Sequence, residues 1–135
     1  MAEDWNIIEC LYALETYRIM DIKQNELHED YVKNDLYKDM FQKMNQASGR
    51  KRTQKALEFK LQNVSAIDPR AQRLHPISAK GNYQQLLDDL YHVYMDQDGK
   101  LTKKIQIDLE LLQQGQYPKY LPINRFEGEL SEIGI

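Results

Sequence analysis

Three consecutive cations, Arg50, Lys51 and Arg52, open the part of the chain that is best suited to binding a polyanion. Thr53 follows as an N-cap residue, and apolar residues at helical spacing then predict a short amphipathic helix. Its polar face carries side chains long enough to reach a base edge: Gln54, Lys55, Glu58 and Gln62. A basic turn leading into such a helix is how a helix-turn-helix presents itself to the major groove. The alternative interpretation is an ordinary core helix with a solvated polar face.

The charge of the chain is unevenly distributed, although the formal net charge is only −3. Residues 41–80 hold nine Lys or Arg against two Asp or Glu, a net charge of +7, whereas residues 1–40 carry −6 and residues 81–135 carry −4. Such an asymmetry orients a polyanion toward one surface. The candidate phosphate-binding cations are Arg50, Lys51, Arg52, Lys60, Arg70, Arg73 and Lys80. The alternative is that these cations pair with carboxylates of the acidic flanks in the folded protein.

Length and composition indicate one small globular protein. The chain has 135 residues, of which 41% are hydrophobic and 29% charged, enough for a real core. The single Cys10 cannot form an intramolecular disulfide, and no apolar run approaches the length of a membrane span or a signal segment. We therefore expect a cytoplasmic protein that does not act at a membrane.

Hydrophobic periodicity predicts an all-α fold of about five helices. They cover about residues 5–20, 31–44, part of 50–68, 83–94 and 101–114, with Asp4 as the N-cap of the first. The predicted core comprises Trp5, Ile8, Leu11, Leu14, Leu36, Met40, Leu57, Leu61, Val64, Leu86, Leu90, Leu109 and Leu112. Residues 70–81 read as a basic loop. We expect residues 1–115 to form a single helical domain and residues 116–135, with Pro118 and Pro122, to form an extended tail or the start of a linker.

The sequence shows no active site, and we expect no enzyme activity, catalytic residue, cofactor or metal. The Asp96-Gln-Asp-Gly turn fails as a calcium loop because Tyr94 and Ile105 would occupy ligand positions that require oxygen donors. The three histidines and one cysteine have no zinc-binding spacing, and no phosphate-binding glycine loop or nucleophile motif occurs. Binding, rather than catalysis, is the expected activity.

The order of the first three predicted helices is that of a helix-turn-helix or Myb-like module. Trp5 lies on the first helix, the second ends at a glycine turn, and the third has a basic head. In addition, residues 4–20, DWNIIECLYALETYRIM, and residues 52–69, RTQKALEFKLQNVSAIDP, resemble the N-terminal domain of HNH-type restriction endonucleases, many of which are modification-dependent. The likeness covers about residues 4–100, with Arg52, Lys60, Leu61 and Asn63 matching the signature.

This resemblance implies a DNA-binding specificity module for double-stranded DNA, modified or unmodified, that acts with a C-terminal nuclease domain or a protein partner. No HNH residues and no cysteine pairs are present, so nuclease activity does not carry over. A second hypothesis is a small helical regulator, such as an antitoxin or a phage-encoded modulator. In that case the tyrosine-rich helix at residues 83–94 or the proline-broken tail would dock on a protein partner.

Overall fold

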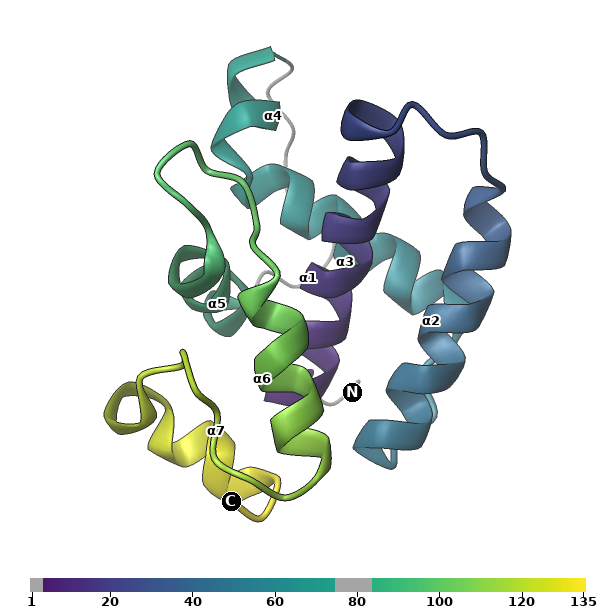
Figure 1. Cartoon of the computed structure of the whole chain (residues 1–135). Helices are drawn as coiled ribbons and strands as arrows, with labels where there is room; N and C mark the ends of the chain where they lie inside the picture. The colour runs from purple at the N-terminus through teal and green to yellow at the C-terminus, as the bar shows by residue number, and fades with distance from the viewer. Residues whose placement is uncertain (1–3, 75–83) are drawn as a thin grey trace.

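The computed structural model describes residues 4–74 and 84–135, and regular structure in them is helical except for one antiparallel bridge between Met95 and Leu101 (Figure 1). The described elements are α1 (Ile7–Asp21), the π-helical η1 (Ile22–Glu26), α2 (Lys33–Ser48), α3 (Gln54–Ile67), α4 (Pro69–Leu74), α5 (Gln85–Tyr94), α6 (Lys104–Gln113), the 3-10 helix η2 (Ile123–Phe126) and α7 (Glu127–Glu132). The all-α prediction is confirmed, with seven α-helices described in place of five. None of the described helices is long and apolar enough to cross a membrane.

Helix α1 is the centre of the fold. A capping box fixes its start, since Asn6 Oδ1 accepts the Glu9 N–H at 2.9 Å and Glu9 Oε1 accepts the Asn6 N–H at 3.0 Å. The N-cap is therefore Asn6, two residues later than the predicted Asp4. Residues 7–16 are all buried, because α2, α3, α5 and α6 each pack against this helix. A helix enclosed on all sides must bury its polar residues too, and Glu9 and Glu15 are among them.

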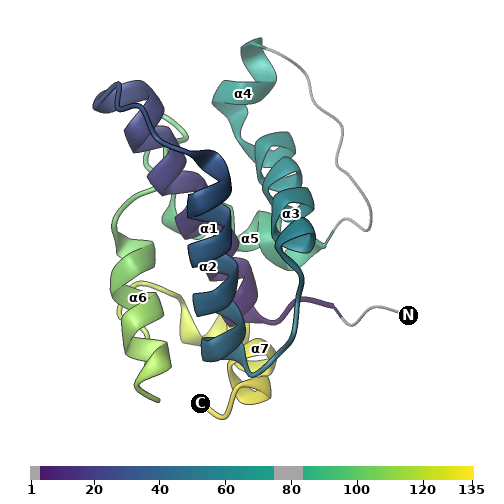
Figure 2. The same ribbon diagram turned by 90° about the vertical axis from the view of Figure 1, so that its right-hand side faces the viewer.

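The surrounding helices cover different sides of α1. Figure 2 shows α3 and α6 on opposite sides of it, with α2 alongside. Helix α3 turns Leu57, Leu61 and Val64 inward, and all three are buried. The predicted core is confirmed, except that Leu36 and Leu86 are only half-buried against it. The inward side of α3 is therefore fixed, and so is the side it presents to solvent.

The C-terminal segment is not the extended tail predicted for residues 116–135. It contains η2 and α7, and its Leu121, Phe126 and Leu130 are buried in the core. The fully buried carboxylate of Asp108 on α6 holds the start of this segment, accepting the N–H groups of residues 119–121 at 2.6–3.1 Å and the Tyr94 hydroxyl at 2.8 Å. The prolines prevent a long helix there, but they do not prevent the chain from packing.

The predicted basic loop at residues 70–81 is helical over residues 70–74, where α4 follows directly on α3, and its remainder lies outside the described residues. The turn between α5 and α6 packs on the start of α4, and Gly99 approaches Pro69 so closely that a Cβ atom on Gly99 would lie 2.5 Å from Pro69 Cγ. Gly99 also has a φ of 84°, and its carbonyl accepts the Tyr91 hydroxyl at 2.6 Å. The end of α3 is thus braced by the α5–α6 turn.

Candidate nucleic-acid interface

The turn between α2 and α3 is held in one conformation by α2 itself. Gly49 ends α2 in the left-handed region with a φ of 72°, as its predicted stop position requires. The Asn45 side chain then donates to the Arg52 carbonyl at 2.7 Å and accepts the Arg52 N–H at 2.9 Å. Thr53 caps α3 by accepting the Ala56 N–H at 3.1 Å, confirming the predicted N-cap. The backbone that carries the three consecutive cations is therefore well defined.

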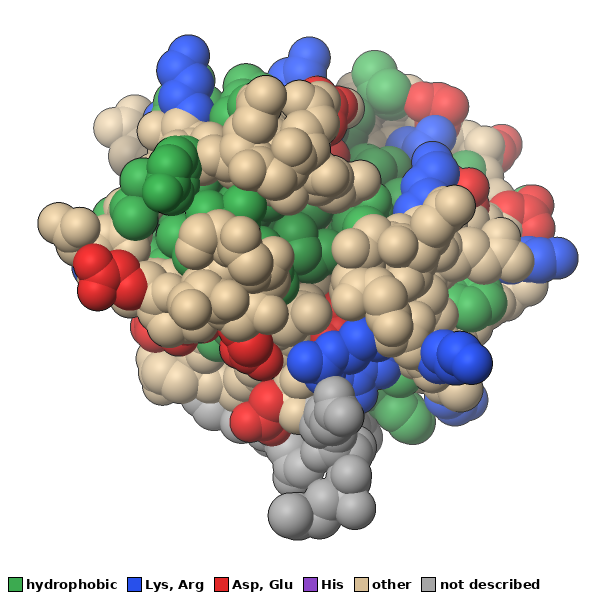
Figure 3. Space-filling model, turned by 90° about the horizontal axis from the view of Figure 1, so that it is seen from below, with side chains coloured by type: hydrophobic (Ala, Val, Ile, Leu, Met, Phe, Trp, Pro, Cys, Tyr) green, Lys and Arg blue, Asp and Glu red, His purple; other side chains and the backbone are tan. Residues whose placement is uncertain are grey.

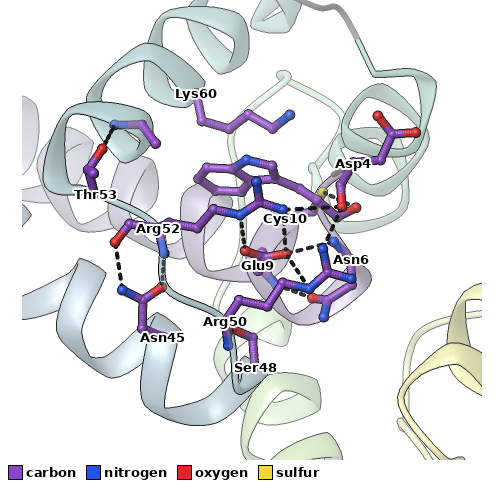
Figure 4. Close-up of polar contacts among 12 residues, drawn as sticks. Asp4, Asn6, Glu9, Cys10, Asn45, Ser48, Arg50, Arg52, Thr53 and Lys60 are labelled. Atoms are coloured by element: carbon purple, nitrogen blue, oxygen red, sulfur yellow. Dashed lines mark hydrogen bonds and ion pairs between the residues drawn. The ribbon is translucent and has the colours of Figure 1, made fainter. Parts of the chain in front are cut away.

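Two of these cations turn inward onto Glu9 of α1 (Figure 4). Arg52 binds the Glu9 carboxylate through both ends of its guanidinium, with Nε 2.6 Å from Oε2 and Nη2 3.3 Å from Oε1. Arg50 Nε lies 3.6 Å from Glu9 Oε1, and Arg50 Nη1 donates to the Asp4 carbonyl at 3.0 Å. Since the Glu9 side chain is fully buried, these guanidiniums compensate its charge. Their contacts are those of a structural ion pair.

Lys60 is the third predicted phosphate ligand that is used inside the fold. Its side chain is only 6% exposed, and its ammonium lies 4.9 Å from the centroid of the Trp5 ring and donates to Gln84 Oε1 at 3.0 Å. The guanidinium of Arg52 also lies 5.4 Å from the centroid of the Trp5 ring. Burial lowers the pKa of Lys60. The neighbouring Cys10 is buried as well, which raises its pKa to about 12 and leaves the thiol unreactive.

Arg70 takes part in a second internal network at the junction of α3 and α4. Its guanidinium binds Asp68 at 3.2 Å and Asp21 of α1 at 3.2 Å, while the Tyr17 hydroxyl donates to Asp68 at 2.8 Å. Burial by itself raises the pKa of Asp68, but the hydrogen bonds from Arg70 and Tyr17 hold it below its ordinary value. Arg70 therefore stabilises this junction.

Six of the seven candidate phosphate ligands lie in the described residues, and these six separate into two groups. Arg50, Arg52, Lys60 and Arg70 bind carboxylates or an aromatic ring inside the fold, which is the pairing with acidic flanks that the sequence left open. Lys51, before the start of α3, and Arg73, in α4 after its end, are exposed, and Lys80 lies outside the described residues. Exposure therefore favours Lys51 and Arg73 as phosphate ligands, together with Lys55 from the base-reading set, which is also exposed.

The four candidate base-reading residues also differ in position. Gln54 is half-buried and donates to Asn34 of α2 at 2.6 Å, and Glu58 is half-buried too. Lys55 and Gln62 are exposed on the outer side of α3. The structure places one further residue between them, Phe59, whose side chain is 50% exposed and whose ring centroid lies 5.7 Å from the Lys55 ammonium. The spacing of 55, 59 and 62 could have revealed it, because these positions share one helical face.

An open pocket of about 420 Å³ lies at the basic turn, lined by Ser48, Gly49, Arg50, Lys51 and Arg52. Seen from the end of the molecule that holds this turn, basic side chains lie at the lower centre, the right and the top, and acidic ones lie at the lower left and the upper right (Figure 3). Across residues 4–74 and 84–135, no group of three or more His, Cys, Asp or Glu side chains could hold a metal ion. Of the three cations that line this pocket, Arg50 and Arg52 bind Glu9, and Lys51 is exposed.

Comparison with known proteins adds no relative: no family model, no curated protein and no solved structure matches the chain. The resemblance to the N-terminal domain of HNH-type restriction endonucleases therefore stays a prediction.

Proposed function

We propose that the protein binds double-stranded DNA, modified or unmodified, through the outer face of α3 and the basic turn before it. One observation carries the proposal. Within the described part of the chain, Lys51, Lys55 and Arg73 are exposed and make no ion pair, while the other predicted cations there are bound internally. Cations that the fold leaves to solvent are the ones able to neutralise phosphates.

The order of these cations along the chain supports a helix in a major groove. Helix α3 has 14 residues and is about 21 Å long, with Lys51 and Lys55 at its start and Arg73 beyond its end. Phosphate contacts at the two ends would place the outer face of α3 in a groove about 12 Å wide. In this proposal α2, the turn and α3 act as a helix-turn-helix, Gln62 reads bases, Lys55 meets a phosphate, and half-buried Gln54 and Glu58 have lesser roles.

The alternative of a protein-interaction regulator has less support because its two docking elements are used in the core. Tyr91 and Tyr94 of α5 are fully buried. In the C-terminal segment, Leu121, Phe126 and Leu130 are buried as well. We therefore infer a specificity module without nuclease activity of its own, which would depend on a separate nuclease domain or a protein partner for any cleavage.

The test is binding of a short fluorescent mixed-sequence duplex, followed by anisotropy between about 50 and 200 mM salt. With three phosphate contacts, the logarithm of affinity should fall with the logarithm of salt at a slope of about −3, and each of K51A, K55A and R73A should reduce that slope by about 1. The matched controls are K103A and K119A, which remove exposed lysines beside α6.

Equal weakening by the control variants would mean that the attraction is diffuse and would contradict a specific face. Absence of binding by the parent at the lowest salt, to modified duplexes included, would contradict DNA binding itself. Thermal melts of all five variants show whether each retains the fold.

A further inference from the structure

The outer face of α3 holds one residue that a phosphate-binding surface does not explain. Phe59 is 50% exposed, although the inward face of the same helix already supplies Leu57, Leu61 and Val64 to the core. It lies between exposed Lys55, four residues before it, and exposed Gln62, three residues after it. These spacings place the three side chains on one helical surface, so an aromatic ring is presented between a cation and an amide.

The Phe59 ring lies beside the Lys55 ammonium, which is 5.7 Å from the ring centroid. Lys55 is exposed and makes no ion pair among the described residues, so an anionic partner would suit this surface. A DNA duplex suits both the Lys55 ammonium and the Phe59 ring. Its phosphates bind the cation, and its major groove offers an apolar group to the ring.

That apolar group is the C5-methyl of a pyrimidine. In the major groove, thymine displays a methyl group that phenylalanine contacts, and adenine of the same pair displays N6 and N7, which the amide of glutamine binds with two hydrogen bonds. Phe59 and Gln62 are one helical turn apart, close enough to meet neighbouring groups along the groove. We propose that α3 selects A·T base pairs, with Phe59 on the thymine methyl and Gln62 on adenine. This inference rests on the proposed DNA binding.

The test compares an A·T-rich duplex containing thymine with the same duplex containing uracil, which lacks only the methyl group. The parent should bind the thymine duplex about fourfold more tightly for each methyl contacted, the ratio expected for burying one such group. F59A should bind both duplexes equally. I107A on α6, which removes another partly exposed apolar side chain, should keep the parent's preference. A duplex with 5-methylcytosine in place of cytosine carries the same methyl group at G·C pairs. It therefore distinguishes a preference for the methyl group itself from a preference for A·T pairs.

The outcomes separate the two proposals. If the parent binds duplexes with the expected salt dependence but does not distinguish thymine from uracil, or if F59A keeps the preference, the methyl-reading role fails and DNA binding stands. If the parent binds no duplex, both fail. If the parent self-associates in light scattering, and F59A abolishes this while leaving DNA affinity unchanged, the face is a protein interface and the inference is overturned. Q62A provides a second variant, which should weaken the preference for A·T over G·C pairs.

Discussion

The two sides of α3 and its leading turn use the same residue types for different purposes. On the inner side, Arg52 and Lys60 surround Trp5 and the buried carboxylate of Glu9. On the outer side, Lys51 and Lys55 stand in solvent with no ion pair among the described residues. Adjacent positions in the sequence therefore differ in environment, and the direction of the side chain decides between stabilising the fold and, in the proposed function, meeting a phosphate.

The difference has a practical meaning for mutagenesis. Removing Arg50, Lys51 and Arg52 together would mix a loss of stability with a loss of binding, because the two arginines compensate Glu9. Single changes on one side at a time keep the two effects apart. An inner variant that impairs binding without unfolding the protein, or an outer variant that unfolds it, would contradict this separation of roles.

The largest effect is expected for Glu9→Ala. It leaves the Arg52 and Arg50 guanidiniums without their buried partner and removes half of the capping box of α1, so the free energy of unfolding should fall by about 3 kcal/mol or more. The measurement is denaturant unfolding. Glu132→Gln, at a carboxylate that is 56% exposed and 3.7 Å from Arg50, should change stability by less than about 0.5 kcal/mol. Equal losses in the two variants would show that Glu9 has no special role.

Next in size is Leu61→Ala, at a side chain that is 6% exposed on the inner side of α3. The lost contacts and the cavity should cost about 2–5 kcal/mol, which a thermal or denaturant transition would show clearly. Its outer neighbour gives the matched control, since Gln62→Ala should stay within about 0.5 kcal/mol of the parent. An unchanged melting temperature for Leu61→Ala would reverse the orientation assigned to α3.

The smallest effect on stability is expected for Lys60→Met, which replaces a buried cation with an apolar side chain of similar length. At neutral pH the variant should lie within about 1 kcal/mol of the parent and bind DNA equally well. Lys55→Met on the outer side should keep the stability and lose affinity. The reverse result for the two lysines would overturn the separation of the two sides.

Lys60 also predicts a pH dependence. Burial holds its pKa below the ordinary 10.5, so between the folded pKa and 10.5 the unfolded state binds more protons than the folded state. The stability of the parent relative to Lys60→Met should therefore rise as pH increases through that window. Denaturant unfolding of both proteins at several pH values isolates this difference from the tyrosines that they share, and a constant difference would contradict it.

Local patterns in the sequence were enough to predict most of the fold. Apolar spacing placed the main helices and nearly all of the core, and Gly49 and Thr53 marked the end of α2 and the start of α3 as predicted. The prediction for the C-terminal segment was wrong because the packing of this segment depends on Asp108. The partners of this charged residue are backbone groups 11 to 13 residues away. A carboxylate on a helix gives no local sign of that use.

The candidate site was harder to predict for the same reason. Glu9 and Arg52 are 43 residues apart, and nothing near Arg52 in the sequence indicates that it pairs with a buried carboxylate. Lys60 occupies a helical position among apolar residues, a signal for burial that its charge concealed. In contrast, Phe59 lies four residues after Lys55 and three before Gln62, so the period of the helix alone would have placed it on the outer face.

The buried Asp108 carboxylate also determines how readily the C-terminal segment exchanges its protons with solvent. Residues 119–121 lie outside the helices, where amide hydrogens ordinarily exchange with solvent through small local fluctuations. Here these amides donate to a fully buried acceptor, so they become accessible only when the segment leaves α6. Their deuterium uptake should therefore report the opening of the whole C-terminal segment, as a slow and concerted step, rather than the mobility of an irregular loop.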